Sequence, residues 1–228
     1  MREGDDLARL IADAAKLEDG DVVVVAHKVV SKAEGRMLPL AGVEPSDEAR
    51  RIAGEGDPRR IEAILREAVR IVRVRDSLVI AETRHGLVCA SAGIDASNAG
   101  EPDTVVLLPL DPDESAVRLR DRLRELTGRT VGVLVTDSFG RPWRQGTTDV
   151  AIGAAGIPVL LDLGGRTDAT GYELHATVIA VADEIAGAAE LVRGKLEGRP
   201  VAVVRGLRLE GDGRARDVVM PRERDLFG

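Results

Sequence analysis

Asp137 and Ser138 follow an apolar run within residues 130–156, where side chains suited to chemistry are most concentrated. The run from Val131 to Val135 predicts a strand that is buried on both faces and that ends at Asp137. Ligands of open α/β sheets collect at the carboxyl ends of strands, so this acid is a candidate for binding a metal ion or a phosphate. The alternative is that Asp137 caps the turn that follows. The residues alone leave both interpretations open.

A second carboxylate, Asp95, lies in the small and polar segment 91–103 together with Asn98, the only Asn of the chain. This composition predicts a loop, and a long loop is costly in entropy unless it binds something. Hard divalent cations take carboxylate oxygens, so Asp95 and Asp137 are candidates to clamp one Mg²⁺ or Mn²⁺ and the phosphates it bridges. Spacing alone does not pair the two acids, and the clamp is a hypothesis at this point.

Three of the four lysines lie in two further polar segments. Lys28 and Lys32 fall in residues 27–36, after an apolar run, and Lys195 falls in the Gly-rich residues 193–200. Cations and free backbone N–H groups suit phosphates. The first segment lacks the Walker spacing, so a solvated loop is the favoured interpretation there. In the second segment, residue type alone favours an ordinary turn over a phosphate contact.

The composition narrows the class of protein. The 228 residues, 44% of them hydrophobic, suffice for one large domain or two small ones with a real core. A net charge of -7 argues against a surface for nucleic acids or anionic membranes. The apolar runs are far shorter than the roughly 20 residues that span a bilayer, and no signal-peptide pattern is recognisable, so we expect a cytoplasmic protein. The single cysteine, Cys89, excludes an internal disulfide framework and is expected to be buried rather than nucleophilic.

Periodicity and capping residues predict the elements that must position these side chains. Helices are expected over residues 4–17, 57–72, 111–128 and 175–193. Strands are expected over residues 22–26, 104–110, 131–135, 157–162 and 201–204, with a hairpin from 77–83 and 86–90. The last helix is expected to be the longest, and its Ala-rich face is either core or dimer interface. Together these elements predict a mixed α/β fold.

Four ordered motifs are similar to those of the coenzyme F420-0:L-glutamate ligase (gamma-glutamyl ligase) family: AHKVVSKAEGR, SAGIDASN, TDSFGRPWRQG with DVAIGAAG, and VADEIAGAAELVRGK. The resemblance runs from Gly4 to Gly206 and implies a single ligase domain over residues 1–228, with a two-lobed mixed α/β fold and an intertwined homodimer. It implies that GTP and Mn²⁺ or Mg²⁺ activate the terminal carboxylate of the deazaflavin precursor F420-0 as an acyl phosphate. The amine of L-glutamate then displaces phosphate to form an amide, and further rounds add gamma-linked glutamates.

The resemblance also implies roles for individual residues. One divalent cation is expected at Asp95 and Asp137, and a second at Ser138, where the family usually has Thr. Arg141 or Arg144 stabilises the acyl phosphate, a hypothesis that rests on position. The residues expected to contact the guanine nucleotide are Ser31, Lys32, Arg36, Asn98, Arg193, Gly194, Lys195, Leu196, Glu197 and Gly198.

Several departures from the family pattern affect these expectations. The family pattern usually has an extra strand and a GTP-contacting loop before the first helix, and some relatives carry a fused nitroreductase-like domain; we expect neither feature within residues 1–228. Gly164 stands where the pattern usually has Arg. Lys195 stands where some members have a Gln near the second metal, and a protonated Lys cannot ligate a cation. Two alternatives stay open: an amide ligase of the same fold that acts on another carboxylate, and a nucleotide-binding homologue impaired in catalysis.

Overall fold

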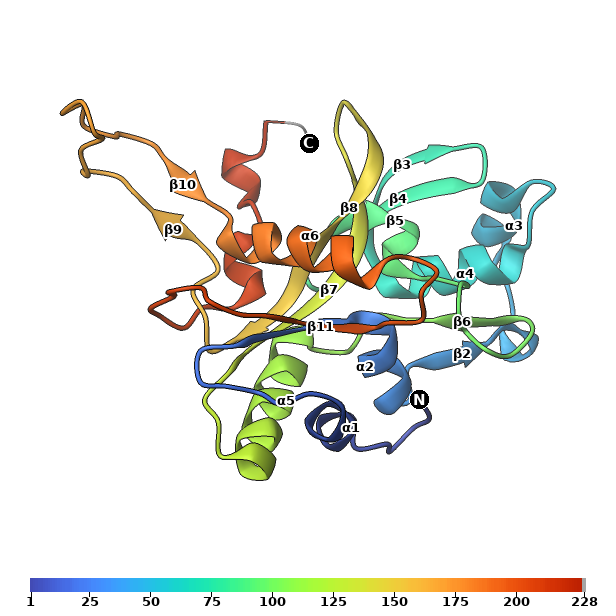
Figure 1. Ribbon diagram of the computed structural model, residues 1–228. Helices are drawn as coiled ribbons and strands as arrows, with labels where there is room; N and C mark the ends of the chain where they lie inside the picture. The colour runs from blue at the N-terminus through green and yellow to red at the C-terminus, as the bar shows by residue number, and fades with distance from the viewer. Residues whose placement is uncertain (227–228) are drawn as a thin grey trace.

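A four-stranded sheet in the order β11-β1-β7-β8 forms the centre of the larger of two lobes in the computed structural model, which describes residues 1–226 (Figure 1). Its strands are β1 (Val22–Ala26), β7 (Gly132–Arg141), β8 (Arg144–Ala155) and β11 (Val201–Val204). β1 and β7 run parallel, whereas the outer strands β11 and β8 pair antiparallel with them. The predicted mixed α/β fold is thus confirmed.

Helices cover both faces of this sheet. Because side chains alternate along a strand, Val23 and Val25 of β1 pack on the side of α1 (Leu7–Ala14) and α5 (Pro112–Thr127). Val22 and Val24 pack on the other side, in the core that includes the Ala-rich face of α6 (Val181–Arg193). The expectation that the central strands are buried on both faces is correct, and the Ala-rich face of α6 contributes to the core.

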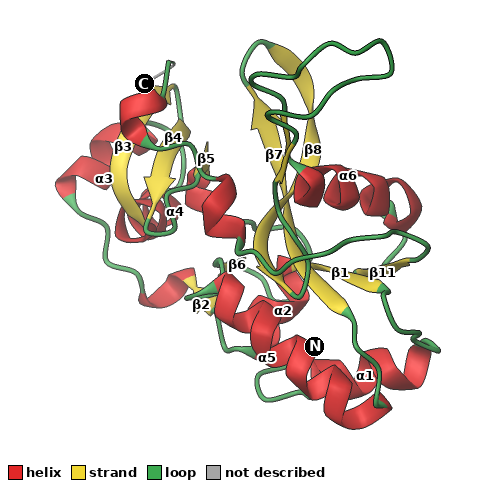
Figure 2. Ribbon diagram, turned by 90° about the vertical axis from the view of Figure 1, so that its left-hand side faces the viewer, coloured by secondary structure: helices red, strands yellow, loops and turns green. Residues whose placement is uncertain are grey.

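The smaller lobe has its own core and lies beside the larger one (Figure 2). It contains the sheet β3-β4-β5, the short pair β2-β6 and two helices. The bounds of these elements are β2 (Met37–Pro39), α3 (Asp47–Ala53), α4 (Pro58–Glu67), β3 (Ala68–Arg75), β4 (Leu78–Thr83), β5 (Val88–Ala90) and β6 (Thr104–Val106). This arrangement confirms the expected two lobes and the expected hairpin, β4-β5.

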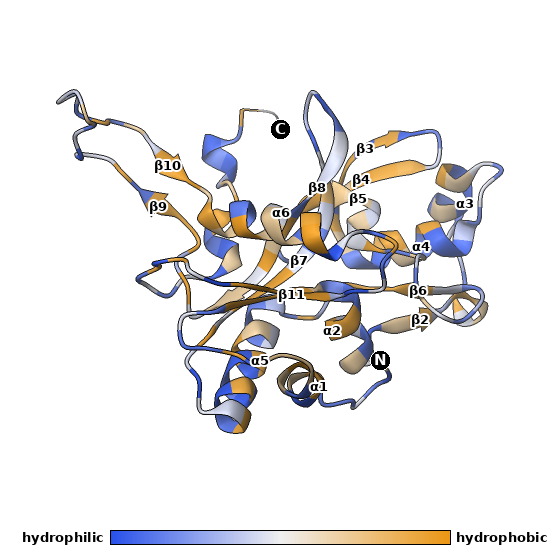
Figure 3. Ribbon diagram, viewed as in Figure 1, coloured by the Kyte–Doolittle hydropathy of each residue, from blue (hydrophilic) through white to orange (hydrophobic). Residues whose placement is uncertain are grey.

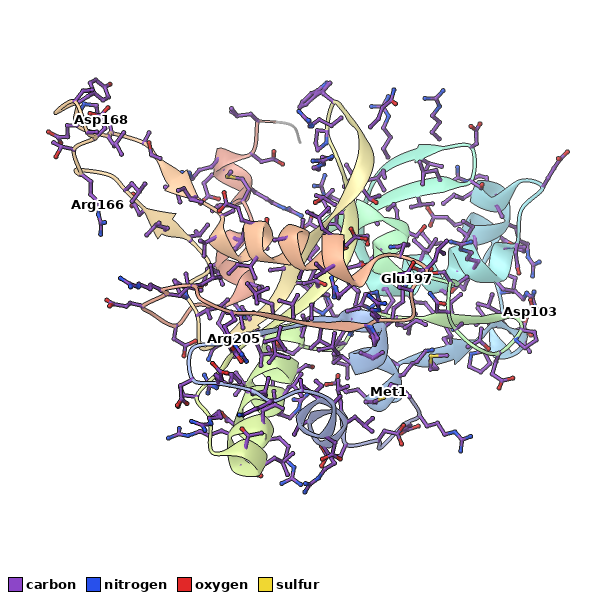
Figure 4. The ribbon with its side chains drawn as sticks, in the orientation of Figure 1. Met1, Asp103, Arg166, Asp168, Glu197 and Arg205 are labelled. Carbon is purple, nitrogen blue, oxygen red and sulfur yellow. The ribbon has the colours of Figure 1, made fainter. Side chains whose placement is uncertain are left out.

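The strands β9 (Leu161–Asp162) and β10 (Val178–Ile179) form the base of an arm that projects away from the larger lobe (Figures 1 and 3). Its tip is hydrophilic and is organised by Asp168, whose Oδ1 accepts hydrogen bonds from the backbone N–H groups of Thr170 and Tyr172. The side chain of Asp168 lies at the far end of the arm in Figure 4. The strand expected over 157–162 is shorter in the structure, where β9 comprises the last two of these residues.

The short elements complete the described chain. They are α2 (His27–Ala33) and the 3-10 turns η1 (Leu40–Gly42), η2 (Ser91–Gly93), η3 (Ala215–Val218) and η4 (Arg222–Arg224). Among the helices within residues 1–226, none combines the length and the apolar character needed to cross a membrane.

Residues 27–33 form a helix, so the prediction of a solvated loop there was wrong. His27, Val30 and Ser31 are buried, and their spacing of three and four residues places them on one helical face. The helical pattern was hidden because the buried face includes polar residues. Burial of this face turns the neighbouring Lys28 toward the rim of the sheet.

The boundaries of several other elements differ from the prediction. The helix expected over 57–72 ends at Glu67, because the β-branched residues that follow pair with β4 as strand β3. The helix expected over 175–193 begins at Val181, and its 13 residues make it shorter than α5, which has 16. The helix expected over 4–17 spans Leu7–Ala14, and the strand expected over 104–110 spans Thr104–Val106.

Candidate active site

A cavity of about 340 Å³ opens where β1 ends beside β7. The parallel pairing of these strands stops at Ala26 and Thr136, after which the chain of β1 turns into α2. β7 continues, paired with β8 as far as Arg141, so the prediction that this strand ends at Asp137 was wrong. We expected the site at the carboxyl end of a strand. It lies there, but the strand that ends at the site is β1 rather than β7.

Five segments line the cavity: the end of β1 with the start of α2, the loop before β6 that carries Asn98, β7 with β8, the end of α6, and the loop that leads to β11. The lining residues are Ala26, His27, Lys28, Val29, Lys32, Asn98, Thr136, Asp137, Ser138, Asp149, Glu190, Arg193, Gly194, Lys195, Leu196, Gly198, Arg199 and Pro200. Three of the four lysines of the chain are among them. The cavity is therefore rich in cations that suit an anionic ligand.

Thr136 and Ser138 are two residues apart on β7 and project to the same face, where both hydroxyls donate to the carboxylate of Asp149 on β8. Thr136 Oγ1 lies 3.0 Å from Oδ2, and Ser138 Oγ lies 2.7 Å from Oδ1. A register shift in the β7-β8 pairing between Val135 and Thr136 precedes this group. Such irregularities redirect side chains, and they are frequent next to active sites.

Arg193, at the end of α6, forms a buried ion pair with the same Asp149. The exposed fractions of the two side chains are 4% and 6%. The guanidinium also donates to Thr136 Oγ1 at 3.0 Å, so Asp149 and Arg193 bind each other while each holds a β7 hydroxyl. The ion pair holds the end of α6 against β8, and removal of either partner would leave the other charge buried and unpaired.

Lys195 extends this network to the surface of the cavity. Its Nζ donates to Ser138 Oγ at 2.7 Å, and Ser138 Oγ in turn donates to Asp149. The loop that carries Lys195 is bounded by Gly194 and Gly198, which have φ values of +64° and +66°. Positive φ is readily available to glycine, so these two positions allow the tight path of the loop over the cavity.

Asp137 projects to the opposite face of β7, toward the buried ring of His27. Its Oδ1 accepts from the backbone N–H of Ser138 at 2.7 Å and lies 3.4 Å from His27 Nε2, too far for a good hydrogen bond. Among the described residues, none gives the buried His27 Nε2 a hydrogen-bond partner. Within residues 1–226, no hydrogen bond reaches Asp137 Oδ2, which leaves that oxygen available to a ligand.

Burial raises the pKa of the Cys89 thiol to about 12, and the negative charge of Asp137 contributes to the same shift. At neutral pH this cysteine is a thiol. The expectation that Cys89 is buried and structural is confirmed.

Asp95 is held by Lys28, whose Nζ lies 2.6 Å from Oδ2. The other carboxylate oxygen accepts from the backbone N–H of Ser97 at 2.6 Å, and Lys28 also donates to Ser97 Oγ. Burial opposes ionisation of Asp95, but the hydrogen bonds from Lys28 and Ser97 outweigh it and lower the pKa of this carboxyl. The carboxylate is therefore charged at neutral pH and bound to a cation that lines the cavity.

The first predicted metal position fits a divalent cation by the chemistry of its donors. Asp137 offers an oxygen without a hydrogen bond, and Asp95 already binds a cationic group, which a hard divalent ion would replace. Residues 1–226 contain no cluster of three or more His, Cys, Asp or Glu side chains poised to hold a metal. Any ion bound here would thus take further ligands from a nucleotide or from water.

Most of the residues expected to bind nucleotide line the cavity. Ser31 and Arg36 do not: Ser31 Oγ lies 3.4 Å from His27 Nδ1, and Arg36 binds Glu67 and the carbonyl oxygen of Leu108. Glu197 belongs to the loop over the cavity, where Figure 4 marks it, but it is not among the lining residues. The expected contacts that do line the cavity are Lys32, Asn98, Arg193, Gly194, Lys195, Leu196 and Gly198.

Arg141 and Arg144 lie at the exposed turn of the β7-β8 hairpin, outside the lining of the cavity. Their proposed role on the acyl phosphate stays a hypothesis. Sequence reasoning did not identify Asp149 as a site residue, and it considered Lys28 as a cation for phosphates rather than as the partner of Asp95. The available signals were an isolated acid in the apolar strand β8 and the concentration of the rare lysines in two segments.

The sequence of this chain is similar to one family model and to several named proteins. A family model described as F420-0:Gamma-glutamyl ligase matches residues 1–206. A protein of Methanopyrus kandleri named Coenzyme F420:L-glutamate ligase is 52% identical over 235 residues, which cover 100% of this chain and 93% of the relative. Relatives of the same name from Methanothermobacter thermautotrophicus and Methanocaldococcus jannaschii are 44% and 43% identical, over 98% and 97% of this chain and 93% and 89% of their own lengths.

Proposed function

The chain belongs to the F420-0:gamma-glutamyl ligase family, and from this membership and the charged cavity at the end of β1 we propose that it joins L-glutamate to coenzyme F420-0 in a GTP-dependent reaction. The observation that supports the proposal most strongly is the shared lining of the cavity. Three lysines and the carboxylate of Asp137 face the same space, as transfer of a phosphoryl group to a substrate carboxylate requires.

The proposed chemistry follows from the low reactivity of a carboxylate. An ionised carboxylate is a poor electrophile, so its oxygen first attacks the γ-phosphorus of GTP, which yields an acyl phosphate and GDP. The amine of L-glutamate then attacks the carbonyl carbon, phosphate departs, and the nitrogen loses a proton to leave the amide. The acyl phosphate must be kept from water between the two steps.

In this reaction the cationic residues of the cavity would bind phosphates, and acidic residues would bind the metal ion. Lys32 and Lys195, with the backbone of the loop after α6, would bind and orient the phosphates. Asp95 and Asp137 would hold a single Mn²⁺ or Mg²⁺, which supplies positive charge against the phosphate oxygens when bound. Arg141 or Arg144 would reach the acyl phosphate from the hairpin turn. Further glutamates would be added in gamma linkage at the same site.

The proposal extends to assembly and place of action. The arm formed by β9 and β10 carries exposed apolar residues, Leu161 and Val178, which fit the intertwined homodimer expected for the family. GTP and free L-glutamate as co-substrates fit an enzyme of the cytoplasm.

The order of the two steps provides the test. The purified protein is incubated with GTP, Mn²⁺, F420-0 and hydroxylamine, without glutamate, and GDP and the hydroxamate of F420-0 are measured. We expect GDP release to require F420-0, and the hydroxamate to form in the absence of glutamate. GDP release that is indifferent to F420-0, with activity on a different carboxylate, would point to another amide ligase. Binding of GTP without GDP release, with both substrates present, would point to a homologue without catalysis.

A further inference from the structure

Lys195 Nζ lies 2.7 Å from Ser138 Oγ, the oxygen expected to bind a second divalent cation. From this contact we infer that the ammonium group of Lys195 takes the place of the second cation, so that each active site of this chain binds one divalent ion. The inference deepens the proposed function and rests on it, because it concerns how the site neutralises the phosphates of a nucleoside triphosphate.

The hydrogen bonds of Ser138 leave little room for a metal. A serine hydroxyl has one proton to donate and two lone pairs to accept with. Its proton is directed at Asp149 Oδ1, 2.7 Å away, and one lone pair accepts from Lys195. A divalent cation bound to Ser138 Oγ would stand about 2.0–2.6 Å from that oxygen, next to an ammonium group of the same sign.

The nearest carboxylate does not attract a second cation either. Asp149 is buried and receives hydrogen bonds from Thr136, Ser138 and Arg193. The charge of Arg193 offsets that of Asp149, so the positive charge of Lys195 is left to face the cavity. A second divalent ion beside Ser138 would meet the ammonium group of Lys195 and a hydroxyl that is already engaged.

The first position differs in each of these respects. Asp137 lines the same cavity but projects from β7 toward His27, whereas Ser138 projects toward Lys195, and Asp137 Oδ2 accepts no hydrogen bond from residues 1–226. A cation held there does not depend on Ser138. Lys195 then acts as a fixed single charge for the phosphates, in the same cavity as the divalent ion held by Asp137.

The number of bound ions tests this inference. Mn²⁺ is titrated into the protein in the presence of one equivalent of the β,γ-imido analogue of GTP, and bound Mn²⁺ is counted from the loss of the free-ion EPR signal, with the analogue alone as blank. We expect one Mn²⁺ per chain for the unmodified protein. For Lys195→Gln, which removes the charge and offers a carbonyl oxygen, we expect two.

Lys16→Gln is the matched control, because Lys16 is the one lysine that does not line the cavity, and it should bind one Mn²⁺. Two ions in the unmodified protein, or one ion in Lys195→Gln with its circular dichroism unchanged, would overturn the role of Lys195 and leave the proposed reaction standing. No bound Mn²⁺ in the unmodified protein would overturn the metal dependence of the proposed function, and the inference with it.

Discussion

Two neighbouring residues on one strand, Asp137 and Ser138, are directed into different surroundings by the alternation of side chains along β7. Ser138 joins a closed network with Asp149 and Lys195, in which each group has a partner. Asp137 has an oxygen without a hydrogen bond within residues 1–226 and a buried histidine ring beside it. At the scale of single residues, the carboxylate with spare capacity is the better candidate for a ligand.

Asp137→Asn should abolish Mn²⁺-dependent GTP turnover, with a fall in Mn²⁺ affinity of about 100-fold, because a charged oxygen ligand is lost. The fold should persist, since an Asn Oδ1 still accepts from the backbone N–H of Ser138. The measurement is GDP release at limiting Mn²⁺. Asp13→Asn, at an exposed position of α1, is the control and should keep the wild-type rate. Wild-type turnover by Asp137→Asn would mean that Asp137 only accepts a hydrogen bond from the backbone and does not bind the metal ion.

The residues of the site differ in how far the sequence could predict them. Asp137 and Asn98 stand next to local signals, a strand that approaches a turn and a polar loop, and both line the cavity. Asp149 reaches Arg193 across 44 residues, and no local pattern encodes a contact that two distant elements create. Arg36 was expected at the nucleotide because the resemblance to the family implied that role, but the fold places Glu67 beside it.

At the scale of elements, the larger lobe depends on how closely α5 approaches β8. A Cβ atom on Gly153 would lie 2.1 Å from the carbonyl oxygen of Pro112 in the first turn of α5. No real side chain tolerates such a distance, so the helix can lie this close only over a glycine.

Gly153→Ala should lower the free energy of unfolding by about 3 kcal/mol or more, because α5 must shift away from the sheet. Gly140→Ala is the matched control on β7, where a Cβ meets nothing within 4 Å, and it should change stability by less than about 1 kcal/mol. Urea unfolding of both variants provides the measurement. Equal stabilities would mean that α5 does not pack on β8 as described.

Arg205 joins β11 to β1 through a bidentate pair with the buried Asp21, at 2.7 and 2.8 Å. These hydrogen bonds lower the pKa of Asp21 against the opposing effect of burial. A carboxyl with a lowered pKa stabilises the fold above its ordinary value of 3.8, and that contribution disappears as the pH falls below it. The last strand in sequence order, β11, is therefore held by a pH-dependent contact.

Arg205→Ala should cost about 1–2 kcal/mol of unfolding free energy at pH 7, a modest figure because the Arg205 side chain is half exposed. The difference from the unmodified protein should stay constant from pH 7 to about pH 5 and shrink below it, where Asp21 becomes protonated. Arg129→Ala breaks an exposed pair with Asp19 and should leave the free energy of unfolding unchanged within the error of the measurement. A difference that grows toward low pH would contradict the assignment.

Elements that rest on local periodicity were predictable, and those that rest on pairing with distant strands were not. Helix α5 has an Asp N-cap, a Pro in its first turn and a Gly at its end, and it spans Pro112–Thr127 as these signals indicate. β3 continued the apparent helical pattern of α4, yet its partner β4 makes it a strand. The extension of β7 past Asp137 likewise comes from β8, which the local sequence of β7 does not encode.

At the scale of the whole molecule, the arm formed by β9 and β10 stands apart from both lobes and exposes apolar residues at its base (Figure 1). Light scattering at micromolar concentration should give twice the 24.3 kDa of one chain, as the proposed homodimer requires. Val178→Asp, on the arm, should weaken the dimer, whereas Leu10→Asp, at a similarly exposed position of α1, should not. A monomeric mass for the unmodified protein would contradict the homodimer.

The most direct test of the proposed activity is mass spectrometry of F420-0 after incubation with this protein, GTP, Mn²⁺ and L-glutamate. We predict a product heavier than F420-0 by one glutamate less one water, formed with GTP and lost in Asp137→Asn, because the carboxylate must be phosphorylated before the amine attacks. The same product formed equally well from ATP, or in the absence of any nucleotide, would contradict the account.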